Sequence, residues 1–173
     1  MWIPRRSALA GLSLWLACSQ LAVAAPRLPG TVQGIACDAR MNCIANDSPG
    51  GQKRHYEQLA ARIRAAGGRF VVNGYCGSGC AILADMVRPR TCITARASFA
   101  YHQAEQVVIH ETTYSSGERV RSTELRYSPN RYSPDLQAWI NARGGEPTGR
   151  TLQEMLKLPN AEARRFFPAC NSL

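Results

Sequence analysis

Residues 73–80 form a small, glycine-rich segment that leads directly into an apolar helical run at residues 81–84. Glycine tolerates backbone conformations that side chains exclude, so this segment predicts a tight strand-to-helix turn with Ser78 at its apex. A second cluster, Asp47-Ser48-Pro49-Gly50-Gly51, also turns the chain sharply ahead of a helical pattern. A chain with two such turns is expected to fold as an α/β domain.

The segments around these turns predict alternating strands and helices. A strand at 43–46 precedes a helix in which apolar residues recur at helical spacing from Tyr56 to Ala66, with Gly67-Gly68 as its stop. Residues 70–72 are continuously apolar, as in a buried parallel strand. The remaining predicted elements are strands at 91–95 and 98–103, an exposed hairpin at 106–127, a helix at 134–143 anchored by Trp139, and a helix at 151–167 with Pro159 as its point of interruption.

The N-terminal residues predict a cleavable signal peptide at 1–24. Arg5 and Arg6 precede an apolar run at 8–17, and the small residues Ala22 and Ala24 fit the positions before a signal-peptidase site. Cleavage after Ala24 leaves one domain over residues 25–173. The apolar run is about 10 residues long and a membrane span needs about 20, so a permanent anchor is not expected.

Lipoprotein processing at Cys18 is the alternative, although Trp15 stands where such sites usually have leucine. The expected location is the periplasm or the extracellular space. Loss of Arg5 and Arg6 lowers the formal net charge from +9 to +7. Solvated arginines are the simplest interpretation of this charge, with contact to an anionic surface as the alternative. Nucleic acid is not an expected partner, because the arginine cluster at 62–69 contains no aromatic side chains.

Six cysteines remain after cleavage, an even number that favours disulfides in an exported chain. Six cysteines permit 15 pairings, of which only a local loop closure between Cys37 and Cys43 is favoured by spacing. No zinc-ligand spacing is present, so no metal is expected, and no cofactor is expected either. The disulfide candidates are Cys37, Cys43, Cys76, Cys80, Cys92 and Cys170.

Three parts of a serine-based catalytic site can be found in the sequence. A serine hydroxyl needs a base to take its proton and amide donors to hold the oxyanion. Ser78 lies between glycines at the start of a helix, where free N–H groups favour an oxyanion. Gly50-Gly51 offer further donors, and His102 follows Ser78 by 24 residues on a strand that can return beside it.

Four motifs in order resemble the proteolytic subunit of the Clp protease and its relatives in the crotonase-like superfamily. The resemblance extends over residues 43–104. The sequence is also similar to a group of small exported proteins with a Cys-x-Ser-x-Cys turn. The resemblance implies a single-domain spiral of strand-strand-helix units. The motifs are Ser48-Pro49-Gly50-Gly51, Gly77-Ser78-Gly79-Cys80-Ala81-Ile82-Leu83, Arg88-Pro89-Arg90 and Phe99-Ala100-Tyr101-His102-Gln103.

The resemblance implies Ser78 as the nucleophile, His102 as the general base, and the amides of Gly51 and Gly79 as the oxyanion hole. In that family an Asp completes the triad, and it aligns near residues 163–166, where this chain has none. Glu162 and the more distant Asp135 are the carboxylate candidates for the third member. A backbone carbonyl or Asn160 is the other source of an orienting hydrogen bond. Without such a group the histidine can hold the wrong tautomer.

The expected function is that of an exported serine hydrolase, such as a peptidase, acting on a peptide or a small ester or acyl substrate. The alternative is a non-catalytic binding protein whose helix-terminus pocket holds an anionic group. A serine–lysine dyad through Lys53 is disfavoured, because Lys53 belongs to a charged helix face. His55 and His110 are expected at the surface. Relatives of this fold form oligomers, but no oligomer is predicted here, because the region after His102 departs from theirs.

Overall fold

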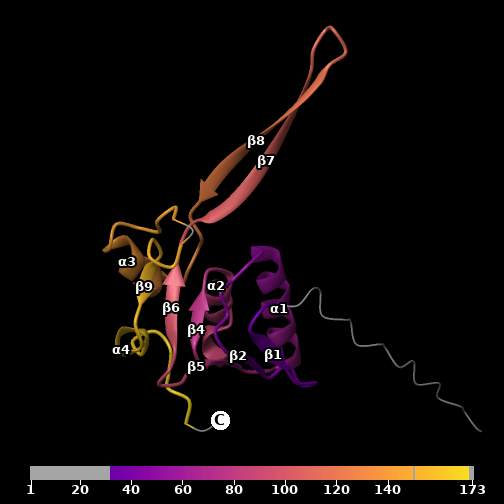
Figure 1. Cartoon of the computed structure of the whole chain (residues 1–173). Helices are drawn as coiled ribbons and strands as arrows, with labels where there is room; N and C mark the ends of the chain where they lie inside the picture. The colour runs from indigo at the N-terminus through magenta and orange to yellow at the C-terminus, as the bar shows by residue number, and fades with distance from the viewer. Residues whose placement is uncertain (1–31, 150, 172–173) are drawn as a thin grey trace, which may run out of the picture.

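The computed structural model describes residues 32–149 and 151–171 (Figure 1). The predicted signal peptide, its cleavage point after Ala24 and the alternative site at Cys18 lie outside the described residues. The described part is a mixed α/β domain with two small sheets, a protruding hairpin and four α-helices. None of its helices is both long enough and apolar enough to cross a membrane.

The first sheet has the strand order β1-β2-β3-β5. β1 (Ile35–Cys37) pairs antiparallel with β2 (Cys43–Ala45), whereas β3 (Phe70–Val72) and β5 (Thr91–Ile93) extend the sheet in parallel. The middle strands are buried, which explains their continuously apolar sequence. The predicted strand–helix–strand unit at 43–73 is present, and β1 is an element that the sequence analysis missed.

The second sheet carries the predicted turn at Ser78. Its order is β4-β6-β9, in which β4 (Tyr75–Gly77) and β6 (Ser98–Tyr101) are parallel and β9 (Leu156–Leu158) is antiparallel to β6. Because β4 and β6 are parallel, the residues that follow them emerge at the same edge of the sheet. Ser78 and His102 are such residues.

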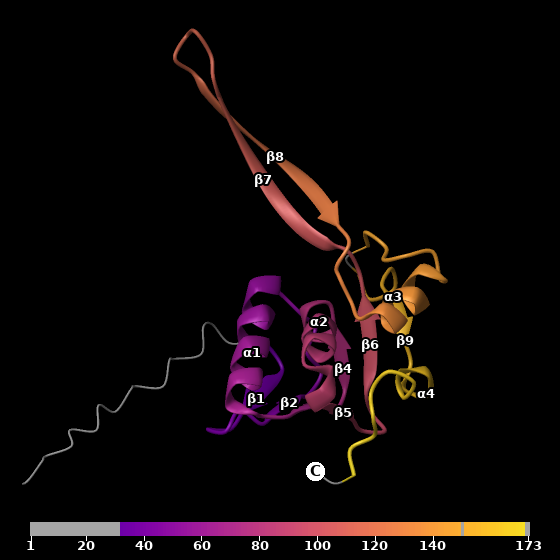
Figure 2. The same ribbon diagram turned by 180° about the vertical axis from the view of Figure 1, so that it is seen from behind.

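Two helices pack against each other beside the sheets (Figures 1 and 2). α1 (Lys53–Ala66) buries Tyr56 and Ile63 at helical spacing and ends at Gly67, whose left-handed φ of 68° suits glycine. α2 (Gly79–Met86) is buried along its first six residues, so it is a core helix rather than an amphipathic one. Together they cover a core whose largest fully buried members include Phe70, Leu83, Ile93, Phe99, Leu136, Ile140 and Phe167.

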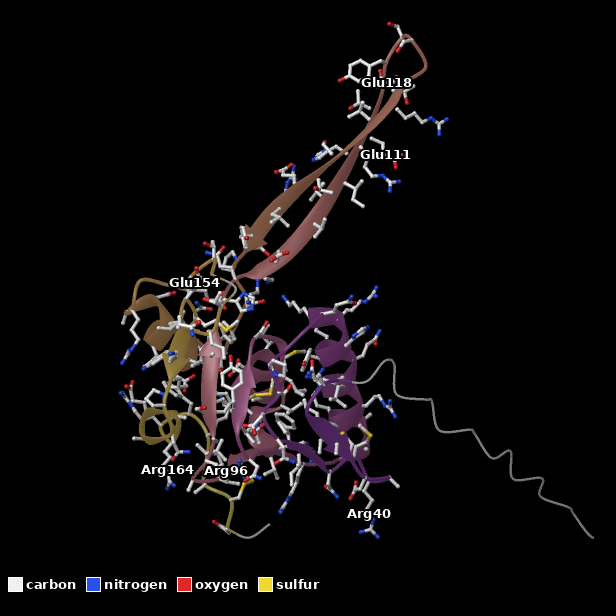
Figure 3. All side chains as sticks on the ribbon, in the orientation of Figure 1. Arg40, Arg96, Glu111, Glu118, Glu154 and Arg164 are labelled. Carbon is white, nitrogen blue, oxygen red and sulfur yellow. A yellow bond between two sulfur atoms is a disulfide. The ribbon has the colours of Figure 1, made fainter. Side chains whose placement is uncertain are left out.

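The predicted hairpin is longer than expected and projects away from the body (Figures 1 and 3). β7 (Ala104–Thr113) and β8 (Arg119–Ser128) pair along their whole length and form a sheet of their own. Alternation puts Val107, Ile109 and Leu125 on one face, and Val107 is 56% exposed and Ile109 55% exposed. Glu111 and Glu118 lie on the outer part of the hairpin (Figure 3).

The second predicted closing helix is wrong. The first, α3 (Pro134–Asn141), is present and buries Trp139, but residues 156–158 form β9 and only a short helix, α4 (Asn160–Ala163), follows. Pro159 lacks a backbone N–H and disfavours helical conformation in the residue before it, so the chain stays extended up to that point. β6 then offers an open edge with which β9 pairs.

Three disulfides join the six cysteines. Cys37–Cys43 closes a local loop, as the spacing predicted. Cys76–Cys80 bridges the end of β4 and the start of α2, and Cys92–Cys170 ties the C-terminal segment to β5 across a sequence separation of 78 residues. Backbone bonds from Ile93 N–H to Pro168 O (2.9 Å) and from Cys170 N–H to Ile93 O (3.0 Å) hold the same junction.

We predict that removing Cys92–Cys170 destabilises the protein more than removing Cys37–Cys43. Loop-closure entropy assigns about 4.5 kcal/mol to the longer loop and about 2.4 kcal/mol to the shorter one. Double Cys→Ser variants of each pair, compared by urea unfolding, test this order. Trp139 is the fluorescence probe, because it is buried in the core and the other two tryptophans precede residue 25. Equal midpoints for the two variants contradict the prediction.

Candidate active site

Ser78 occupies a strained strand-to-helix turn between β4 and α2. Its φ of 51° and ψ of −119° lie on the side of backbone space that non-glycine residues rarely adopt. Such conformations cost on the order of 1–3 kcal/mol and persist only when the surrounding structure imposes them. A sharp turn of this kind exposes the serine hydroxyl at the edge of a sheet, as in the nucleophile elbows of serine hydrolases.

Backbone bonds and a disulfide impose this turn. The Ser78 N–H donates to Ala100 O at 2.9 Å, and the Ile82 N–H donates to Ser78 O at 3.1 Å. Cys76 and Cys80 are fully buried on either side of the serine and are joined to each other. The sequence analysis left the partners of these two cysteines open, and in the structure the disulfide between them closes the turn.

The Gly50-Gly51 loop is held directly beside Ser78. Ser48 connects it to β4, because its N–H donates to Tyr75 O at 2.7 Å and its carbonyl accepts from the Gly77 N–H at 2.9 Å. Gly50 has a φ of 97°, and a Cβ at this position would lie 2.5 Å from the Cβ of Ser78. The glycine is therefore required both by the backbone conformation and by the close approach of the two turns.

His102 meets Ser78 at the edge of the second sheet. Its Nε2 lies 2.7 Å from the Ser78 Oγ, which is hydrogen-bond distance. The register of β4 and β6 pairs Gly77 with Ala100, so Ser78 and His102 lie one and two residues beyond this pair. The 24 residues between Ser78 and His102 therefore correspond to the connection from the parallel strand β4 to β6.

The two amide donors expected from the resemblance lie around the same cleft. This cleft has a volume of about 440 Å³. Gly79 is the first residue of α2, where backbone N–H groups have no intrahelical acceptor. A side chain at Gly79 would collide with the ring of Tyr56. The cleft is lined by Pro49, Gly50, Gly51, Gln52, Lys53, Ser78, Gly79, Ile82, His102, Ala104, Glu105, Asn130 and Met155.

The residues expected to complete a triad are engaged elsewhere. Glu162 accepts from Trp139 Nε1 at 2.8 Å and from Arg143 at 2.7 Å. Asp135 accepts from Arg88 at 2.6 Å, and Asn160 donates to the carbonyls of Thr94 and Ala97. None of these three side chains bonds to His102 in the structure. The Nδ1 atom of His102 is buried and has no hydrogen-bond partner within the described residues.

Two buried polar residues that the sequence analysis missed lie beside His102. Asn130 is 3% exposed and its Nδ2 donates to the His102 carbonyl at 3.0 Å. Glu146 is 7% exposed and accepts from the Asn130 N–H at 2.6 Å, from Asn130 Nδ2 at 3.0 Å and from the Tyr132 hydroxyl at 2.6 Å. Burial beside Glu146 raises the pKa of Tyr132, which keeps its hydroxyl protonated as a donor.

Of the other titratable residues noted in the sequence, Lys53 and His110 are exposed and His55 is partly buried. Lys53 lines the cleft but is exposed and lies 3.9 Å from Glu57 on its own helix. His110 is exposed on the hairpin and lies 2.9 Å from Glu124, while His55 is half-buried on α1. Within residues 32–149 and 151–171, no three histidine, cysteine or acidic side chains gather as metal ligands.

Comparisons with protein-family models, with curated protein sequences and with solved structures give no match to this chain.

We predict that Gly50→Ala is strongly destabilising, whereas Gly117→Ala is tolerated. Both glycines have positive φ, but nothing lies within 4 Å of a Cβ at Gly117. Backbone strain costs Gly117→Ala about 1 kcal/mol, while Gly50→Ala adds a collision with Ser78 that costs about 1–3 kcal/mol more. Urea unfolding followed by Trp139 fluorescence measures both. A Gly50→Ala variant as stable as Gly117→Ala contradicts the packing described here.

Proposed function

We propose that this chain is an exported serine hydrolase that forms an acyl-enzyme on Ser78. The observation that carries the proposal is the 2.7 Å contact between His102 Nε2 and Ser78 Oγ, at a strained turn facing a cleft. A serine, a base within hydrogen-bond distance and amide donors at a helix start are the parts that acyl transfer requires. A peptide or a small ester is the proposed substrate class.

The reaction follows from these positions. The Ser78 Oγ attacks the acyl carbonyl carbon while His102 Nε2 takes the hydroxyl proton. The carbonyl oxygen becomes an oxyanion, which the N–H groups of Gly51 and Gly79 stabilise. His102 then gives its proton to the leaving alcohol or amine as the acyl–oxygen or acyl–nitrogen bond breaks. A water molecule, deprotonated by His102, attacks the acyl-enzyme and releases the acid with Ser78 restored.

We propose a Clp-protease-like or crotonase-like spiral as the finer description of the fold. Support comes from two successive strand–helix units, β2–α1–β3 and β4–α2–β5, with parallel pairing of β2 with β3 and of β3 with β5. We further propose a periplasmic or extracellular location. Three disulfides persist most readily in an oxidising compartment, and the sequence of residues 1–24 fits a signal peptide.

A non-catalytic binding protein is the second candidate function. The observation that favours it is the absence of a carboxylate bonded to His102 Nδ1 within the described residues. In that case the amides around Ser78 hold an anionic group such as a carboxylate without turning it over. The two functions differ in whether Ser78 reacts covalently with an electrophile.

Fluorophosphonate labelling of the oxidised protein distinguishes the two functions. We predict one phosphonyl adduct per chain by intact-mass analysis, with no adduct on Ser78→Ala and a rate at least about 100-fold lower on His102→Ala. Ser116→Ala, at the exposed hairpin turn, is the matched control and should label like the wild type. A folded wild-type protein that remains unlabelled contradicts the hydrolase and favours the binding function.

A further inference from the structure

Two buried polar atoms in the active-site region have no hydrogen-bond partner within the described residues. One is His102 Nδ1, and the other is the side-chain oxygen Oδ1 of Asn130. Unpaired buried polar groups are costly and rare in folded proteins, so each requires an explanation. Here one atom is a potential donor and the other is an acceptor, and the Asn130 side chain already bonds to the His102 carbonyl.

Glu146 determines which way the Asn130 amide faces. The Nδ2 group lies 3.0 Å from Glu146 Oε1 and 3.0 Å from the His102 carbonyl, and both of these atoms only accept hydrogen bonds. The NH₂ group must therefore be on that side, which leaves Oδ1 as the free acceptor. A second bond, from the Asn130 backbone N–H to Glu146 Oε2 at 2.6 Å, holds the residue in place.

His102 requires an acceptor of this kind. Its Nε2 has to be unprotonated to take the Ser78 proton, so the neutral ring must carry its proton on Nδ1. A buried Nδ1–H without an acceptor disfavours this tautomer. Glu146 is committed to other groups, since three hydrogen bonds from the Asn130 N–H, Asn130 Nδ2 and the Tyr132 hydroxyl hold its carboxylate.

We propose that Asn130 is the positioning residue of His102, with its Oδ1 accepting the Nδ1 proton and with buried Glu146 holding the amide in that orientation. This inference rests on the proposed function. Catalytic hydrogen bonds are often open in the unliganded enzyme and tighten when substrate binds. An amide oxygen fixes the tautomer but stabilises the imidazolium less than a carboxylate does, so the site is built for slower turnover than an Asp-containing triad.

The first test combines labelling rates with nitrogen NMR of the His102 ring. We expect N130A to slow fluorophosphonate labelling about 10- to 1000-fold and to shift neutral His102 from the Nδ1–H to the Nε2–H tautomer. N141A is the matched control, because Asn141 lies exposed on α3, and it should change neither readout. A folded N130A protein that keeps both the wild-type rate and the wild-type tautomer overturns the proposal.

A rescue experiment covers the case in which N130A does not fold. The double substitution N130D/E146Q keeps one carboxylate and one amide in the pair but moves the charge next to His102. We expect the folded double variant to retain the Nδ1–H tautomer and to label at least as fast as the wild type. Slower labelling together with loss of that tautomer overturns the proposal.

Failure of the hydrolase and failure of this inference give different results. If wild-type protein does not label but N130A still shifts the His102 tautomer, the proposed hydrolase is wrong and the positioning role stands. If wild-type protein labels and N130A changes neither readout, the hydrolase stands and the positioning role is wrong.

Discussion

The backbone turn at Ser78 is the constraint on which the rest of the site depends. A positive φ at a serine is unfavourable, and it is held by contacts from several directions: the Cys76–Cys80 disulfide, the bond from the Ser78 N–H to Ala100 O, and the close approach of Gly50. The disulfide is local to the turn, whereas the other two contacts come from distant parts of the chain, so the geometry of the site depends on the packed core as well as on the local sequence.

The same turn places both the Ser78 hydroxyl and the start of α2. It directs the Ser78 hydroxyl out of the sheet edge toward His102, and it starts α2 at Gly79, which lines the same cleft. Tyr56, whose ring lies where a Gly79 side chain would be, connects this arrangement to α1. Burial raises the pKa of Tyr56, so its hydroxyl remains protonated near Ser48. The cleft is thus supported by both helices.

Local patterns in the sequence were sufficient for the elements that surround the site. Glycine clusters and apolar periodicity predicted β2, α1, β3 and α2, and the parallel crossover explains why Ser78 and His102 meet. The hairpin was also predicted over residues 106–127, and the pairing continues at its base through Ala104, Glu105 and Ser128, which carry no alternating apolar pattern. The helix predicted across Pro159 failed because the partner strand β6 is distant in sequence.

The polar residues behind His102 could not have been predicted in this way. Asn130 and Glu146 lie 16 residues apart and come from segments without regular structure, and in sequence each resembles an ordinary loop residue. Only their burial distinguishes them, and burial of a polar pair depends on the complete fold. Glu162 and Asp135 are candidates by their position in the chain, but in the structure their carboxylates form ion pairs with Arg143 and Arg88.

The most direct test of the central claim is a crystal structure of the oxidised protein after reaction with a fluorophosphonate. The account predicts phosphorus bonded to Ser78 Oγ, with a phosphonyl oxygen accepting from the N–H groups of Gly51 and Gly79 and with His102 beside the adduct. An adduct on another residue, or one on Ser78 whose oxygen points away from both amides, would contradict the account.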